Sequence, residues 1–158
     1  MVFSNINLPN DVETTFQDKL VEFVTCHRPL GITFDSIGKF HTHIVNIIKS
    51  ASQRLCAQRK LKYVLNRHCL QHIHLIFIRP IFEYACELWD GCSQQDSDNL
   101  EKLQLEAGRI VTGLPLFASR ESIYSETVWE LLSDRRKVRS SAYFILFTIN
   151  LPQNIFVI

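Results

Sequence analysis

The stretch HTHIVNIIKSASQRL, residues 41–55, decides the fold class of this chain, because its apolar residues recur with the period of an α-helix. The residues of this apolar stripe are Ile44, Ile47, Ile48, Ala51 and Leu55. We therefore expect an amphipathic helix that begins near His41, with His41 or Thr42 as its cap. Gln58 falls where the stripe requires an apolar side chain, so we expect the helix to fray toward Lys62.

Upstream of this helix the sequence has the texture of short β-strands separated by turns. Four runs are rich in β-branched and aromatic residues, namely VFSNINL, ETTF, LVEFVTC and LGITF, and the segments PND and RP interrupt them. Three or four short antiparallel strands fit this pattern, and they are too few to be stable without packing on another element. The pattern predicts a division into a β-strand part, residues 1–36, and a helical part, residues 37–158.

Three further helical stripes follow in the downstream half. The second contains Leu70, Ile73, Phe77, Ile81, Tyr84 and Leu88. The third contains Leu100, Leu103, Ala107, Ile110 and Val111, with a capping box from Asp98 to Glu101 and an end at Gly113. The fourth contains Leu131, Val138, Ala142 and Ile145, after a turn-like segment at 119–127. Because the connections are short, the sequence predicts a mainly α fold with short N-terminal strands and an antiparallel helical bundle.

The segment RPIFEYACELWDG, residues 79–91, places a proline within the second stripe. Pro80 has no amide hydrogen, so a continuous helix would kink there. Alternatively, a new helical segment begins with Pro80 in its first turn, where the missing donor costs nothing. Both interpretations leave the aromatic residues of this segment as packing residues.

Charge is distributed unevenly along the chain although the net charge is only +1. No acidic residue occurs from Ser36 to Phe82, and the window from Glu83 to Glu106 is acidic with one base, Lys102. A basic helix face opposite the apolar stripe can contact phosphates without reading sequence. The candidate nucleic-acid-binding residues are Lys49, Arg54, Arg59, Lys60, Lys62 and Arg67. The alternative interpretation of such a charge run is a solvated helix face.

Catalytic and metal-binding patterns are weak in this sequence. His68 and His72 have the i, i+4 spacing of zinc ligands, with Cys69 between them and His74 after them, but no CxxC pair or second cluster follows. No nucleophile motif, glycine-rich phosphate loop or pair of catalytic carboxylates is present. We therefore expect no catalytic residue, no metal site and no cofactor, and structural histidines are the preferred interpretation.

The cysteines and the C-terminal segment indicate the cellular compartment. The five cysteines are irregularly spaced, and no signal-peptide pattern opens the chain, so we expect reduced thiols and an intracellular location, in the cytoplasm or nucleus. Residues 140–158 carry no charge, but Pro152 and several amide side chains are costly in lipid. We expect a buried terminal helix with a frayed tail and no membrane contact.

Five motifs occur in a fixed order, namely RPLGITFDS, HTHIVNIIKSASQRL, FIRPIFEYACELWDG, EKLQLEAGRIVTGL and ELLSDRRKVR. In this order and spacing, over residues 25–139, the chain resembles the region downstream of the catalytic palm in reverse transcriptases of non-LTR (LINE-type) retrotransposons. The resemblance implies that the first 36 residues correspond to the last palm strands and that the helices are thumb and post-thumb. In that family the thumb packs on the template–primer duplex, so the implied partner is an RNA–DNA or DNA duplex backbone.

The chain also departs from the family pattern. It has no adjacent Asp pair, so the two Mg²⁺ ions of the family would belong to a palm that is missing here, and we do not expect the chain to polymerise alone. Val128 stands where family members often have glycine, and Gly108 where alanine is usual. These departures suggest a fragmentary or decayed copy. The main alternative is a non-enzymatic helical interaction protein, or a vestigial one, that self-associates through an exposed apolar face including LGITF and the second helix.

Overall fold

The computed structural model describes residues 15–16, 19–20, 26–35 and 37–150 of the chain, and it begins with two short antiparallel hairpins. Strand β1 (Thr15–Phe16) pairs with β2 (Lys19–Leu20), and β3 (Cys26–His27) pairs with β4 (Phe34–Asp35) around a 3-10 turn, η1 (Pro29–Gly31). The predicted strand in VFSNINL and most of the one in LVEFVTC lie outside the described residues. The division at residue 36 stays a prediction.

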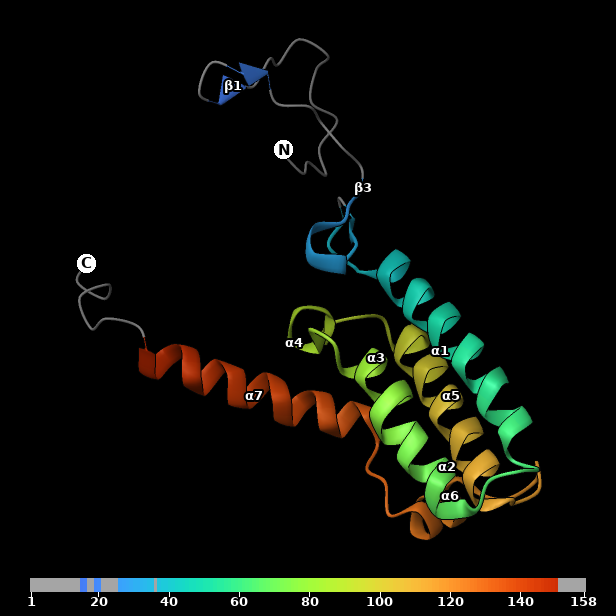
Figure 1. Cartoon of the computed structure of the whole chain (residues 1–158). Helices are drawn as coiled ribbons and strands as arrows, with labels where there is room; N and C mark the ends of the chain where they lie inside the picture. The colour runs from blue at the N-terminus through green and yellow to red at the C-terminus, as the bar shows by residue number, and fades with distance from the viewer. Residues whose placement is uncertain (1–14, 17–18, 21–25, 36, 151–158) are drawn as a thin grey trace.

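The remainder is helical, as the sequence predicts. The helical elements are α1 (His41–Leu61), α2 (Arg67–Ile73), the π-helical turn η2 (His74–Ile78), α3 (Arg79–Glu83), α4 (Cys86–Trp89), α5 (Gln94–Thr112), α6 (Arg120–Thr127) and α7 (Leu132–Asn150). Figure 1 shows α1, the rod from α2 to α3, and α5 side by side, running down, up and down. Consecutive rods are therefore antiparallel, and α1 and α5 run in the same direction.

The core lies between these three rods. It is built around large side chains with no exposed surface, including Trp89, Phe82, Ile44, Ile78 and Leu100. Small residues such as Ala51 of α1 and Ala107 of α5 allow the rods to approach closely. The mainly α fold class with short N-terminal strands is thus confirmed.

The second predicted stripe is wrong beyond its first turn, because a π-helical turn shifts the buried face. In η2 the amide of Arg79 donates to the carbonyl of His74, five residues earlier. A π turn takes up more residues than an α turn, so the faces rotate relative to the α-helical period. The buried residues are Leu70, His74, Ile78, Phe82, Cys86 and Trp89.

The predicted stripe instead lies at the surface in its second half. Phe77, Tyr84 and Leu88 are each more than half exposed. Pro80 lies in the first turn of α3, and α3 follows the π-helical turn without a break in helical backbone, so this proline begins a new segment within one continuous rod. The helix ends at Glu83, and Ala85, in the left-handed region at φ 48°, separates it from α4.

The ends of α1 differ from expectation at two points. Phe40 is the N-cap residue, and neither His41 nor Thr42 caps the helix with its side chain. Gln58 does not fray the helix, which continues to Leu61. Its amide is buried and donates to the carbonyl of Leu70 at 2.8 Å, so a polar residue in the stripe connects α1 to α2.

The later helices also begin at other positions than predicted. Helix α5 starts at Gln94, because Ser93 caps it by accepting a hydrogen bond from the Asp96 amide, so the capping box at Asp98 is wrong. Its end at Gly113, with φ 78°, is confirmed. The segment at 119–127 is not a turn but helix α6, capped by Ser119.

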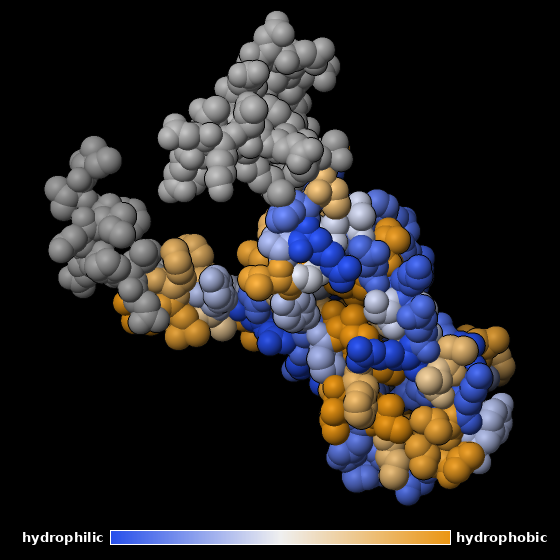
Figure 2. Space-filling model, turned by 45° about the horizontal axis from the view of Figure 1, so that its top comes forward, coloured by the Kyte–Doolittle hydropathy of each residue, from blue (hydrophilic) through white to orange (hydrophobic). Residues whose placement is uncertain are grey.

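Helix α7 is not the buried terminal helix that we expected. Leu132 and Arg136 at its start are buried, whereas Val138, Ile145 and Ile149 are exposed. Figure 1 shows this helix leaving the bundle, and Figure 2 shows hydrophobic side chains along its outer part. Within the described ranges, no helix combines the length and apolar character needed to cross a membrane.

Candidate nucleic-acid interface

Two of the six candidate cations lie on the outer face of α1. Lys49 and Lys60 are separated by 11 positions, which is close to three helical turns, so they point to the same side. Both are exposed, and neither has a partner among the described residues. Helix α1 contains no acidic residue, so nothing on the helix itself neutralises this face.

Three other candidates hold the bundle together instead. Arg54 donates to the carbonyl of Phe77 in the π-helical turn, where the regular α-helical hydrogen-bond ladder is interrupted. Arg59 is paired with Glu106 of α5. These contacts link α1 to two neighbouring rods.

Arg67 likewise bridges two elements. Its guanidinium binds the side chain of Glu126 at 3.0 Å and also donates to the Glu126 carbonyl, which connects α2 to α6. The charge of a paired arginine is largely balanced locally. The six candidates therefore do not form one continuous phosphate-facing surface.

The sixth candidate, Lys62, lies in a groove where the ends of α1 and α5 meet. The parallel course of the two helices brings these ends together, as two ion pairs show. His41 at the start of α1 contacts Asp96 in the first turn of α5 at 3.0 Å, and Arg59 contacts Glu106 near the other end. C-terminal residues of both helices therefore face the same space.

This groove, which we call the basic groove, has a volume of about 600 Å³. It is lined by Arg59, Lys62, Tyr63, Lys102, Glu106, Arg109, Ile110, Gly113, Leu114, Pro115 and Leu116. Lys102, Glu106 and Arg109 follow at i, i+4 and i+7 and so share one face of α5.

Electrostatics distinguish this groove from its surroundings. Four cations, Arg59, Lys62, Lys102 and Arg109, face a single carboxylate, Glu106, among the lining residues. The buried Nε of Arg109 has no hydrogen-bond partner within the described ranges. Two helix C-termini contribute roughly half a negative charge each, which leaves the groove positive.

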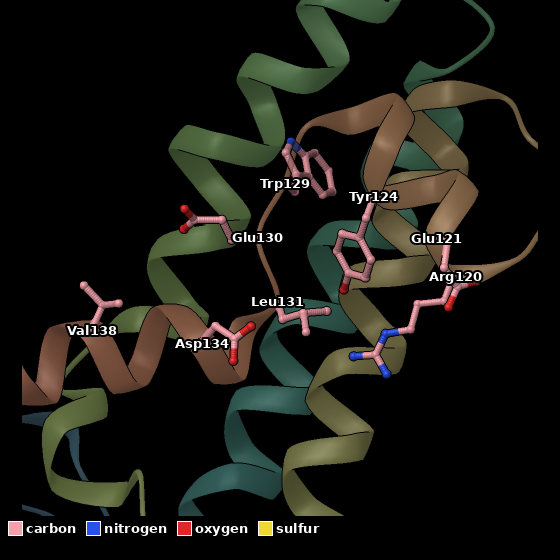
Figure 3. A pocket seen from close by; sticks show the side chains of 8 residues that line it. All are labelled: Arg120, Glu121, Tyr124, Trp129, Glu130, Leu131, Asp134 and Val138. Carbon is pink, nitrogen blue, oxygen red and sulfur yellow. The ribbon is translucent and has the colours of Figure 1, made fainter.

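A second cavity, of about 680 Å³, lies where α6, the connecting segment 128–131 and α7 meet (Figure 3). Its charged lining residues are Arg120, Glu121, Glu130 and Asp134. Arg120 is already paired with Glu101 at 3.3 Å, so the cavity carries an excess of negative charge. It does not suit a phosphate.

Tyr124 forms one wall of this second cavity and is held by hydrogen bonds. Burial and its hydrogen bond to Glu101 raise the pKa of the Tyr124 phenol well above its ordinary value. Glu101 also accepts the amide hydrogen of Leu132 at 3.1 Å, at the start of α7. These contacts fix the junction of α5, α6 and α7, and they give the phenol a structural role.

The histidines that suggested a zinc site are divided between two environments. The rings of His68 and His72 lie 4.3 Å apart on the surface of α2. His74 is fully buried and stacks on Trp129, with the ring centroids 4.0 Å apart. In the described ranges no three His, Cys, Asp or Glu side chains gather as a metal site would require. All five cysteines fall within these ranges and are free.

Sequence reasoning missed Lys102 and Arg109 as members of a basic surface. Both lie in or beyond the acidic window, where most nearby carboxylates are engaged elsewhere. Their i, i+7 spacing on one predicted helix face was the available signal. Their meeting with Lys62 depends on the parallel packing of α1 and α5, which local sequence does not encode.

The fold and its electrostatics define a helical bundle with two unneutralised cationic surfaces, the outer face of α1 and the basic groove. Among known proteins, the chain is similar to a probable RNA-directed DNA polymerase from transposon BS of Drosophila melanogaster, with 23% identity over 122 residues. The similarity covers 72% of this chain and 13% of that polymerase. No family model matches the chain, and no solved structure matches it. The similarity supports a relationship to transposon reverse transcriptases.

Proposed function

We propose that this chain is the thumb-side region of a LINE-type retroelement reverse transcriptase and that it binds the backbone of a nucleic-acid duplex without sequence preference. The similarity to a transposon RNA-directed DNA polymerase carries the proposal. The chain spans 13% of that polymerase, and it contains no adjacent Asp pair. In this proposal the chain holds template and primer.

Contacts between distant motifs of the resemblance support this proposal. Glu83, in FIRPIFEYACELWDG, accepts hydrogen bonds from Arg135 at 2.6 Å and Arg139 at 2.7 Å, in ELLSDRRKVR. The Glu83 side chain is only 12% exposed, so an unpaired carboxylate there would be unfavourable. Two motifs about fifty positions apart thus serve one packing arrangement, which accounts for their joint occurrence.

The outer face of α1 supplies the binding surface in this proposal. Lys49 and Lys60 are exposed, unpaired within the described part of the chain and free of neighbouring acids on the helix. Lysine ammonium groups contact phosphates as point charges, which suits recognition of a backbone and not of bases.

The test is the salt dependence of binding to a labelled RNA–DNA hybrid. Replacing both residues, as Lys49→Gln and Lys60→Gln, should weaken binding and lower the slope of log K against log salt by roughly 1.8, about 0.9 for each lost phosphate contact. These lysines are more informative than Arg59, because Arg59→Gln would also break the pair with Glu106.

Lys137→Gln is the control, because Lys137 is an exposed lysine on α7, away from both cationic surfaces, and its ion pair with Asp134 on the same helix is long, at 3.9 Å, and solvent-exposed. It should leave the slope unchanged. Absence of binding at low salt, or an unchanged slope in the double variant, would contradict the proposal.

Self-association through an apolar face is a second candidate function, and α7 favours it. Tyr143, Ile145, Phe147 and Ile149 on its outer part are each more than half exposed. Exposed apolar patches of this kind mark contact surfaces in soluble proteins. The occupant in this proposal is the same helix of a second copy.

Sedimentation over a range of protein concentrations tests this candidate. The unmodified chain should form dimers, and the double variant Ile145→Glu and Ile149→Glu should remain monomeric, because charged side chains do not tolerate burial at an apolar contact. The control variant Lys137→Glu adds negative charge to α7 outside the patch and should still form dimers. A chain that is monomeric at all concentrations would exclude the candidate.

A further inference from the structure

We infer that the basic groove binds an unpaired strand of nucleic acid, with a base stacked on Tyr63 and phosphates held by Lys62, Lys102 and Arg109. This inference rests on the proposed function and adds to it a second site with a different substrate class. The groove lies at the C-terminal end of the α1–α5 pair, so it adjoins Lys60 and is separated from Lys49, which is near the middle of α1.

The charge of the groove favours a polyanion. Four lining cations and one lining carboxylate give an excess of about three positive charges at neutral pH. Cations near helix C-termini also compensate helix dipoles, but two termini contribute only about one negative charge in total. Dipole compensation alone therefore does not account for all four cations.

Arg109 adds a guanidinium to the groove lining. Its Nε is buried and has no hydrogen-bond acceptor among the described residues, as is also true of eight other buried side-chain atoms there, so this nitrogen does not mark a ligand by itself. The outer nitrogens of a guanidinium bind phosphate oxygens in pairs, which suits a phosphate in the groove.

Tyr63 supplies the feature that distinguishes a single strand from a duplex. Its side chain is 88% exposed on the rim of the groove, directly after the end of α1. Base stacking on an aromatic ring is the usual means of binding single strands without reading sequence. In a duplex the bases stack on one another, so a ring on the rim meets a free base only where the strand is unpaired.

Apolar residues complete the lining of the groove. Leu116 is 88% exposed and lines the groove together with Leu114 and Pro115. Figure 2 shows hydrophobic side chains gathered at this lower end of the bundle among hydrophilic ones. A mixture of cations and apolar side chains matches a ligand that has charged phosphates and flat, largely apolar base faces.

The experiment measures binding of the whole chain to a fluorescein-labelled dT 12-mer and to a blunt RNA–DNA hybrid at the same salt concentration. Tyr63→Ala should weaken binding to the 12-mer on the order of tenfold, as expected for loss of one stacked base. Tyr63→Phe keeps a flat ring and should bind nearly as well as the unmodified chain. Binding to the blunt hybrid should be unchanged in both variants.

Two further variants separate the groove from general effects. Lys137→Gln removes an exposed lysine on α7, outside the groove and outside the apolar patch, and should leave both affinities unchanged. Lys102→Gln should weaken binding to the 12-mer more than binding to the hybrid. Because Tyr63 and Lys102 are exposed, these variants should retain the helical circular-dichroism spectrum of the unmodified chain.

The outcomes distinguish failure of this inference from failure of the proposed function. Equal affinity of the unmodified chain and Tyr63→Ala for the 12-mer would overturn the groove site, while hybrid binding through Lys49 and Lys60 would still stand. Absence of binding to both ligands would overturn both. A competition experiment tests the class of ligand, with poly-glutamate and polyphosphate as competitors of the 12-mer. If both displace the 12-mer at the same concentration, the groove accepts acidic protein equally well, and the nucleic-acid assignment is overturned.

Discussion

Val128 adopts a backbone conformation that favours glycine, which is the residue that the resemblance implies at this position. It closes α6 with φ 58° and ψ 33°, and its amide donates to the Tyr124 carbonyl at 2.8 Å. The left-handed region costs an L-residue roughly 1–2 kcal/mol, and a β-branched side chain fits it poorly. In this chain Val128 is therefore a strained residue at the end of α6.

Val128→Gly should stabilise the chain. Relief of roughly 1–2 kcal/mol of strain exceeds the 0.5–1 kcal/mol that glycine's extra freedom in the unfolded chain costs. Little packing is lost, because Val128 is 86% exposed. Thermal unfolding should show an increase of a few degrees in Tm.

Val45→Gly is the control for this substitution, since Val45 is also partly exposed but lies within α1. There glycine should lower stability by about 1 kcal/mol. If both variants lower Tm equally, the left-handed backbone at Val128 is not a source of strain.

His74 gives the chain a stability that depends on pH. Burial, together with the positive charge of Arg79, lowers the pKa of His74 to about 3 in the folded chain. In the unfolded chain the pKa of histidine is near 6.5. Below about pH 6.5 the unfolded chain therefore takes up a proton that the folded chain does not, and stability falls until the pH approaches 3.

His74→Phe should remove this dependence while keeping a ring stacked on Trp129. Between pH 6 and pH 4 the free energy of unfolding should decrease less steeply with falling pH in the variant than in the unmodified chain. The difference between the two slopes should be up to about 1.4 kcal/mol per pH unit, the contribution of one proton. Urea unfolding at several pH values measures the slope. His68→Gln changes an exposed histidine and should leave the slope as it is; an equally steep slope in His74→Phe would contradict the assignment to His74.

At the scale of elements, the contact between α5 and α6 depends on a glycine that the family resemblance marks as unusual. A β-carbon at Gly108 would lie 2.4 Å from Cγ2 of Ile123, which is fully buried on α6. Gly108 is therefore not a defect of α5 in this chain, and the two helices approach each other more closely than alanine would permit.

Gly108→Ala should destabilise the chain although alanine favours helix by about 1 kcal/mol, because overpacking costs about 1–3 kcal/mol. Ile123→Ala removes Cγ2 and leaves a cavity, so the two substitutions should compensate each other. A double-mutant cycle in urea should give a coupling of at least about 0.5 kcal/mol.

Gly91→Ala is the matched control, because a β-carbon at Gly91 would meet no atom within 4 Å beyond its chain neighbours, and the φ of Gly91 is not positive. This substitution should be nearly neutral. If the changes in unfolding free energy caused by Gly108→Ala and Ile123→Ala are strictly additive, the two helices can move apart without a free-energy cost, and the close contact is not required.

The π-helical turn is the second determinant at this scale. It rotates the residues after His74 so that Ile78 and Phe82 enter the core and Phe77 faces outward. Arg54 compensates the interrupted helix by donating to the Phe77 carbonyl. Arg54, which the sequence suggests as a phosphate ligand, is therefore a structural residue, and the reason is one local change in helix type.

At the scale of the whole molecule, the arrangement of three rods determines where charge accumulates. The up-and-down course of the chain makes α1 and α5 parallel, and their C-terminal cations therefore meet in the basic groove. Helix α7 is tied to α3 through Glu83 and then leaves the bundle. The two cationic surfaces and the apolar outer part of α7 therefore lie on different parts of the molecule and are open to independent tests.

The sequence by itself determined the helical class, the start of α1 at His41 and the end of α5 at Gly113, because hydrophobic periodicity and glycine caps act over a few residues. It also identified Lys49 and Lys60 as outward-facing cations, since the apolar stripe of α1 defines the opposite face. These features are local, and local sequence is sufficient for them.

Only the tertiary structure decided the rest. The pairing of Arg54, Arg59 and Arg67 and the exposure of α7 depend on residues distant in sequence, and the buried face after His74 follows from a π turn that the apolar period does not reveal. The basic groove depends on them most, because Lys62 and Lys102 become neighbours only when α1 and α5 pack in parallel. The physical reason is that burial and charge balance are properties of the packed bundle, whereas periodicity is a property of each helix alone.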